Sequence, residues 1–288
     1  MNGVAYVRII RPSGCLMVSL IAVTGQLIAS GGLPGISTVT SAFMTGFLMT
    51  ASSFTINDYL DHEIDAINAP WRPIPSGLMT RDEALRLGVA LGLMGSTVSL
   101  YTSAVACIVA VGSLLLSILY TVKGKYLGLM GHVMVAICIA ASFIFGALTV
   151  TAGVTPLVLG VFTVSFLYVL GGELTQSISD IDGDLSKGVK SVAILWGRRA
   201  AAVGAAVCYV LTAFAGAAVS SVYGSGLGPY TLVFVFGTLS AVCFITLPLL
   251  RSPEEGTARA VRKRINNLAY IIIFVLLAVS LSTMSSAG

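Results

Sequence analysis

Two groups of acidic residues have a spacing that suits metal chemistry. Asn57, Asp61 and Asp65 recur at every fourth position, and Asp180 and Asp184 repeat this spacing later in the chain. On a continuous helix such residues share one face, where like charges repel each other, and the repulsion grows as the dielectric constant falls. We therefore expect cations between the two groups.

The candidate ligands favour magnesium. All of them are oxygen donors, and the chain has only 2 histidines and 5 cysteines, with no closely spaced cysteine pair. Oxygen donors without thiolate or imidazole select a hard ion. Magnesium usually takes one or two carboxylates and completes its shell with water and phosphate oxygens. Two carboxylate groups across a cleft thus predict Mg²⁺ ions that hold a diphosphate and stabilise it as a leaving group.

Basic residues near the acids are candidates for contacts to phosphate oxygens. Arg72 precedes a loop with two prolines, Lys123 lies in a short loop after an apolar stretch, and Lys190 follows the second acidic group. Lys125 lies in the same loop as Lys123 and could also contact phosphate, but it is interpreted first as an anchor. The run Arg259–Arg264 is interpreted as an anchor to lipid headgroups.

Two further polar residues lie in apolar stretches. Glu173 is a functional candidate, because an acid inside a membrane span usually serves function. His132 is interpreted as a packing residue held by hydrogen bonds.

The segments that carry these residues must cross a membrane. The 288 residues are 56% hydrophobic and only 10% charged, whereas a soluble domain has about 25% charged residues. The mean hydropathy of +0.96 agrees, so the bilayer is the expected solvent. The net charge of +4, without a basic patch interleaved with aromatics, argues against a nucleic-acid partner.

Nine apolar stretches are long enough to cross the bilayer. They cover residues 13–33, 36–57, 82–102, 104–121, 127–150, 155–173, 200–222, 229–250 and 265–285. The sequence therefore predicts an all-α integral membrane protein in which residues 1–288 form a single domain.

The charges predict the orientation of these spans. All 16 lysines and arginines and all 12 acids fall in loops on one side of the membrane or in the helix turns beside them. The positive-inside rule places this side in the cytoplasm. We expect a multi-pass protein of the cell membrane whose N-terminus and active-site loops are cytoplasmic.

The positions of the acidic groups also predict an internal repeat. The second span leads into the first group and the sixth span leads into the second group. An offset of four helices preserves orientation, so two four-helix halves would be parallel repeats with the site between them. The prediction is one helical bundle with a cytoplasmic cap over the active site.

The motifs resemble those of a known family. Residues 57–65, followed by Arg-Pro-Ile-Pro-Ser-Gly at 72–77, resemble the first signature of the UbiA superfamily of intramembrane prenyltransferases, and residues 180–191 resemble the second. The resemblance covers essentially the whole chain. It implies magnesium-dependent transfer of a prenyl group from its diphosphate to an acceptor held in the membrane.

The resemblance also implies roles for individual residues. The implied metal ligands are Asn57, Asp61, Asp65, Asp180 and Asp184. The implied diphosphate ligands are Arg72, Lys123 and Lys190. Tyr120 would lie near the reacting carbon and would act with Asp61 and Asp180 in catalysis.

Within the superfamily, residues 11–15 and 57–77 are most similar to archaeal digeranylgeranylglyceryl phosphate synthases. That similarity implies transfer of a geranylgeranyl group to geranylgeranylglyceryl phosphate. Trp71 stands where many relatives have an acid, and residues 176–178 lack a lysine–aspartate pair of that group. An aromatic acceptor such as 4-hydroxybenzoate or another quinone precursor is therefore the alternative.

A polytopic transporter is the alternative from another functional class. Its ionisable residues would lie near the middle of the bilayer, whereas here they gather at one end of the predicted spans. Ionisation of the diphosphate followed by attack of the acceptor is the expected mechanism. The base that accepts the acceptor's proton would be an aspartate or the departing diphosphate.

Overall fold

The computed structural model describes residues 3–223, 237 and 242–285, and these residues form helices without any strand. Eight of the described helices are long and apolar enough to cross a membrane. They are α2 (Pro12–Ser30), α3 (Ile36–Leu60), α5 (Arg81–Thr102), α6 (Ala104–Val122), α7 (Leu129–Leu148), α8 (Pro156–Ser179), α11 (Arg198–Tyr223) and α14 (Glu255–Ser285).

The shorter helices connect these spans. They are α1 (Gly3–Ile10), α4 (His62–Asn68), the 3-10 helix η1 (Gly124–Tyr126), α9 (Ile181–Ser186), α10 (Val192–Trp196), the π-helix η2 (Val242–Thr246) and α13 (Leu247–Arg251). The predicted eighth span, 229–250, lies largely outside the described residues.

Two predicted spans have wrong ends. The sixth was expected to end at residue 173 and continues to Ser179, and the last was expected to begin at residue 265 and begins at Glu255. Both helices continue through polar residues. Side chains such as Gln176 and Arg262 are accommodated there because they line the cavity. A hydropathy pattern ends a span at such residues although the backbone remains helical.

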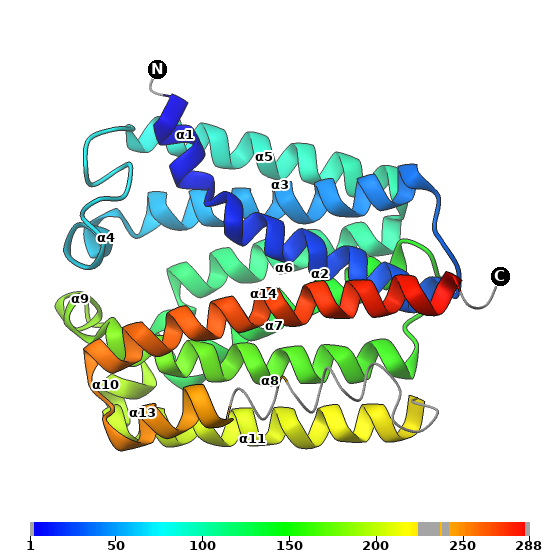
Figure 1. Ribbon diagram of the computed structural model, residues 1–288. Coiled ribbons are helices and arrows are strands. Elements are labelled where there is room, and N and C mark those ends of the chain that lie inside the picture. The colour runs from blue at the N-terminus through cyan, green and yellow to red at the C-terminus, as the bar shows by residue number, and fades with distance from the viewer. Residues whose placement is uncertain (1–2, 224–236, 238–241, 286–288) are drawn as a thin grey trace.

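The long helices form a single bundle of two similar halves (Figure 1). In the first half α3 packs against α2 and α5, and in the second half α8 packs in the same way against α7 and α11. Helix α14 packs against both α2 and α8. This arrangement matches the repeat predicted from the two acidic groups.

The halves are joined where α2 crosses α7. Small residues allow two helix backbones to approach closely in a membrane, and at this crossing a Cβ on Gly146 would overlap the carbonyl oxygen of Ala22. A Cβ on Gly25 would likewise overlap the carbonyl oxygen of Phe143. The crossing therefore depends on glycine in both helices.

The short helices α4, α9 and α10 lie together at one end of the bundle, on the left in Figure 1. Helix α4 packs against α9, and a Cβ on Gly183 would overlap the side chain of Asn68. Lys187 Nζ also donates to Glu63 Oε2 at 2.7 Å, which links the two helices. These contacts connect the two halves above the ends of α3 and α8.

Candidate active site

A cavity of about 1520 Å³ lies between the two halves and is lined by side chains from α2, α3, α6, α7, α8 and α14. Its wall is apolar in the middle of the bundle, where Met49, Phe143, Phe145, Val164 and Leu276 line it. Its wall is polar and charged at the end where α3 and α8 finish. The cavity can thus hold a molecule with an apolar chain and an anionic head.

Each half contributes an aspartate from a break between two helices. Asp61 separates α3 from α4 with φ −96° and ψ 13°, and Asp180 separates α8 from α9 with φ −107° and ψ 9°. These values lie in the sparsely allowed bridge region, where many active-site residues are found.

The breaks keep the expected spacing of the polar side chains. Asp61 N donates to Asn57 O and Asp65 N donates to Asp61 O, both at 2.8 Å, and Asp184 N donates to Asp180 O at 3.1 Å. Backbone hydrogen bonds four residues apart therefore continue through both breaks. All five predicted metal ligands line the cavity.

The first acidic group is paired with basic residues. Arg72 forms ion pairs with both Asp58, at 3.2 Å, and Asp65, and Lys125 pairs with Asp61. Arg11 pairs with Asp58 as well. Asp58, with 1% of its surface exposed, holds two arginines and was not among the predicted site residues.

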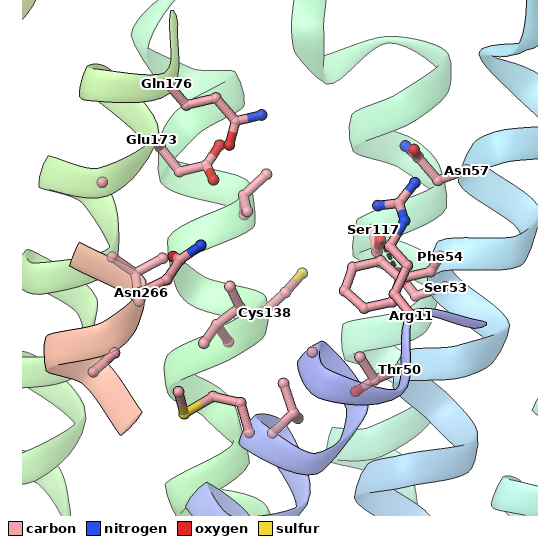
Figure 2. A pocket seen from close by; sticks show the side chains of 18 of the residues that line it. Arg11, Thr50, Ser53, Phe54, Asn57, Ser117, Cys138, Glu173, Gln176 and Asn266 are labelled. Carbon is pink, nitrogen blue, oxygen red and sulfur yellow. Dashed lines mark hydrogen bonds between the residues drawn. The ribbon is translucent and has the colours of Figure 1, made fainter. Parts of the chain in front are cut away.

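Asn57 is oriented by a neighbouring helix. Its Nδ2 donates to Thr121 Oγ1 at 2.8 Å and to Asp61 Oδ2 at 3.4 Å. Since the nitrogen is used by these contacts, the amide oxygen is the atom available to a ligand. Figure 2 shows Asn57 on the same wall of the cavity as Ser53 and Arg11.

The second acidic group has neutral partners instead. Gln176 Nε2 donates to Asp180 Oδ2 and Ser179 Oγ donates to Asp180 Oδ1, both at 3.0 Å. No lysine or arginine of the described residues forms an ion pair with Asp180 or Asp184. Burial and the charge of Asp180 raise the pKa of Asp184 to about 7. Burial also raises the pKa of Asp61, against the opposing effect of Lys125.

The predicted diphosphate ligands divide into two sets. Arg72 lines the cavity, as does the predicted catalytic residue Tyr120, whereas Lys123 and Lys190 are exposed and are not part of its lining. In the turn at 123–125 the lysine that reaches the cavity is Lys125, which was interpreted as a lipid anchor and is nearly buried beside Asp61. The 3-10 turn η1 directs neighbouring lysines to opposite sides, which spacing alone does not reveal.

Glu173 and His132 also line the cavity. Glu173 Oε2 lies 3.9 Å from His132 Nδ1, and His132 Nε2 accepts a hydrogen bond from Val192 N at 3.5 Å. His132 thus has one long hydrogen bond, and its buried Nδ1 has no hydrogen-bond partner among the described residues. In Figure 2 Glu173 and Gln176 lie on the wall opposite Asn57 and Arg11.

The donor atoms at this end fit magnesium. Within the described ranges no three His, Cys, Asp or Glu side chains converge on a single point. A closed protein cage is therefore absent there, and each ion would take one or two side chains with water and substrate oxygens, as Mg²⁺ usually does. Asp180 and Asp184 have no lysine or arginine ion-pair partner among the described residues, so a cation that binds there meets no competing ion pair.

Comparison with known proteins identifies the family. The model of the UbiA prenyltransferase family matches residues 18–268. The chain belongs to the UbiA prenyltransferase family. It is thus a multi-pass membrane enzyme that transfers prenyl groups, as the motifs indicated.

Similar proteins carry a more specific name. A digeranylgeranylglyceryl phosphate synthase from Thermococcus kodakarensis is 33% identical over 96% of this chain and 98% of its own length. One from Methanoregula boonei is also 33% identical, with the same shares of both chains. A solved structure described as a digeranylgeranylglyceryl phosphate synthase in membranes has 26% identity and a TM-score of 0.76, and covers 98% of this chain and 100% of its own.

A more distant structure shares the fold. A UbiA homologue from Archaeoglobus fulgidus bound to GPP and Mg²⁺ has a TM-score of 0.78 at 15% identity, over 96% of this chain and 99% of its own. This likeness confirms the predicted helical bundle.

Proposed function

We propose that this enzyme transfers a geranylgeranyl group from geranylgeranyl diphosphate to geranylgeranylglyceryl phosphate. The observation that carries the choice of acceptor is the name shared by relatives that are 31–33% identical over at least 94% of this chain. The cavity supports it, because an apolar chamber with a charged end suits two prenyl lipids with phosphate heads.

The two acidic groups would hold magnesium on opposite walls of the cavity. In this proposal the ligands are Asn57, Asp61, Asp65, Asp180 and Asp184. When bound, Mg²⁺ neutralises the diphosphate and so makes it a better leaving group. The chain itself orients the ligands, since Thr121 fixes Asn57 and Gln176 fixes Asp180.

Two basic residues would bind phosphate oxygens beside the acids. Arg72 and Lys125 both line the cavity and both contact the first acidic group. We assign the diphosphate contacts to these residues, and not to Lys123 and Lys190, which are outside the lining. Arg72 can form two parallel hydrogen bonds to phosphate, whereas Lys125 supplies a compact charge.

The reaction would proceed by ionisation of the allylic C–O bond. The cation forms in the apolar part of the cavity, and the ring of Tyr120 on the α6 wall would stabilise it by a cation–π interaction. The glycerol hydroxyl of the acceptor then forms the new C–O bond. Its proton passes to an oxygen base at the charged end, either a carboxylate or the departing diphosphate.

We further propose that the charged end faces the cytoplasm and that residues 1–288 act as one domain in the cell membrane. The support is the distribution of the 16 lysines and arginines, which gather on this side of the bundle. Labelling of cysteines introduced at exposed positions, such as Asp182→Cys, in sealed membranes would test the orientation. If the charged end faces the inside, the introduced cysteine should react with a membrane-impermeant reagent only after the membranes are opened.

Acceptor competition tests the proposed function directly. Purified enzyme in detergent receives Mg²⁺ and labelled geranylgeranyl diphosphate, together with equal concentrations of geranylgeranylglyceryl phosphate and 4-hydroxybenzoate. A labelled diether lipid is the expected product. A prenylated ring would contradict the proposal and would place the enzyme among aromatic prenyltransferases.

A further inference from the structure

Further basic residues line the cavity at the α1–α2 junction and at the start of α14. Arg8 and Arg11 come from the α1–α2 junction, and Arg259, Arg262 and Lys263 come from the first turns of α14. We call these five residues the cationic rim. The start of α14 lies at the same end of the bundle as α9 and α10 (Figure 1), so the rim belongs to the charged end of the cavity.

The rim has an excess of positive charge. All 12 acidic residues of the chain are among the residues described. Arg11 pairs with Asp58, and Arg259 pairs with Glu255. Across the described ranges no ion pair involves the remaining three rim residues, Arg8, Arg262 and Lys263. Like charges gathered in a cavity wall repel one another unless an anion lies between them.

Arg11 is held in an unusual conformation. Its backbone has φ 49° and ψ 70°, a left-handed region that residues other than glycine rarely adopt. Its guanidinium lies over the Phe54 ring, 4.8 Å from the ring centroid, and pairs with Asp58. Such strained residues concentrate at binding and catalytic sites. Burial lowers the pKa of Arg11 against the opposing charge of Asp58, and the charges of Arg72 and, to a smaller extent, Arg262 add to the lowering.

One face of α14 changes from cationic to apolar along the cavity. Arg259 and Arg262 line it first, Asn266 follows one turn later, and Ile273 and Leu276 line it in the middle of the bundle. Residues three or four apart share a helix face, so this face is continuous. It is complementary to a molecule with an anionic head and a long apolar tail.

The same part of α14 is fixed against α2. Tyr270 Oη donates to the carbonyl oxygen of Ser13 at 2.5 Å. Ser13 is the second residue of α2 and follows Arg11 closely, and Tyr270 lies on α14 beyond the basic residues that end at Arg264. The hydrogen bond thus holds together the two helices that carry the rim.

We propose that the cationic rim binds the phosphate monoester of a prenylated lipid acceptor, whose chain extends along α14 into the cavity. This inference rests on the proposed function, because it assigns the acceptor of that reaction to a subsite. Two substrates that both carry phosphate need separate cations, and the diphosphate is assigned to Arg72, Lys125 and the Mg²⁺ that the acidic groups would hold. Guanidinium groups suit a phosphate that enters at headgroup depth.

The test compares two acceptors in detergent micelles, with Mg²⁺ and geranylgeranyl diphosphate held constant. The acceptors are geranylgeranylglyceryl phosphate and its dephosphorylated form, geranylgeranylglycerol. The variants are Arg262→Gln, Lys263→Gln and the charge-preserving Arg262→Lys. The matched control is Arg264→Gln, because Arg264 has the same charge on the same helix and is equally exposed, but lies outside the cavity lining.

For each glutamine variant we expect the KM for the phosphorylated acceptor to rise about tenfold, the loss typical of one charge-assisted hydrogen bond. The KM for geranylgeranylglycerol and for geranylgeranyl diphosphate should remain unchanged. Arg262→Lys should lose less than Arg262→Gln, and Arg264→Gln should behave like the wild type. Thermal unfolding in detergent checks that every variant is folded.

Three results would overturn the inference. An equal rise of the KM for the diphosphate would assign the rim to the donor. Unchanged constants in micelles, with losses only in vesicles of anionic lipid, would mean that the rim binds membrane headgroups. Failure of the wild type to prenylate the phosphorylated acceptor would overturn the proposed function as well, so the two failures are distinguished by the wild-type measurement.

Discussion

Asp61 and Asp180 occupy nearly the same backbone conformation at corresponding breaks of the two halves. Their φ values are −96° and −107° and their ψ values are 13° and 9°. Each follows a membrane span and precedes a short helix, and both line the same cavity. The repeat therefore places two carboxylates from distant parts of the chain at one end of one chamber.

Replacement of these junction aspartates should abolish turnover without unfolding the protein. We expect Asp61→Ala and Asp180→Ala each to lower kcat/KM by at least about 100-fold, as removal of a group that stabilises transition-state charge does. Prenyl transfer from labelled geranylgeranyl diphosphate measures the loss. Asp182→Ala is the matched control, because Asp182 lies in α9 but is exposed and outside the cavity lining. Activity retained in both junction variants would refute the site.

The sequence predicted the bundle and the acidic groups because long apolar runs and charged residues at their ends are visible in one dimension. It did not predict which lysine of the turn at 123–125 enters the cavity, because that depends on the 3-10 geometry of η1. It also interpreted Arg262 and Lys263 as lipid anchors, although both line the cavity. Composition reveals that these residues are charged, whereas only packing reveals which side of α14 they occupy.

Asp58 should be important for stability. It is buried, it pairs with Arg11 and Arg72, and it lies outside the cavity lining. Asp58→Asn removes a charge that compensates two arginines, and breaking a buried pair costs about 3 kcal/mol. We expect a clear drop in the Tm in detergent, measured by intrinsic fluorescence. Asp82→Asn, which changes an exposed aspartate at the start of α5, should leave the Tm nearly unchanged. Equal effects of the two substitutions would contradict this role.

The α2–α7 crossing should tolerate no side chain at position 146. Gly146→Ala would place a Cβ against the carbonyl oxygen of Ala22, so the helices must move apart. Overpacking of this kind costs about 1–3 kcal/mol, and the Tm should fall accordingly. Gly112→Ala is the control, because Gly112 lies on an exposed face of α6 with nothing within 4 Å of the added Cβ. A Tm unchanged by Gly146→Ala would mean that the halves are not joined by close contact here.

Magnesium affinity should depend on pH through Asp184. Burial and the charge of Asp180 raise its pKa to about 7, so in the metal-free protein the carboxyl is mostly protonated below that pH and mostly ionised above it. Because a metal ligand must be deprotonated, protons compete with Mg²⁺ as the pH falls. Between pH 8 and pH 6 we expect a loss of up to about tenfold in affinity, since each pH unit below the pKa lowers the ionised fraction about tenfold.

Calorimetric titration of Mg²⁺ in two buffers of different ionisation enthalpy would detect about half a proton released per binding event at pH 7. Asp184→Asn should bind Mg²⁺ more weakly and lose this proton release, whereas Asp182→Asn should keep both. Proton release that survives in Asp184→Asn would assign the titration to another carboxylate.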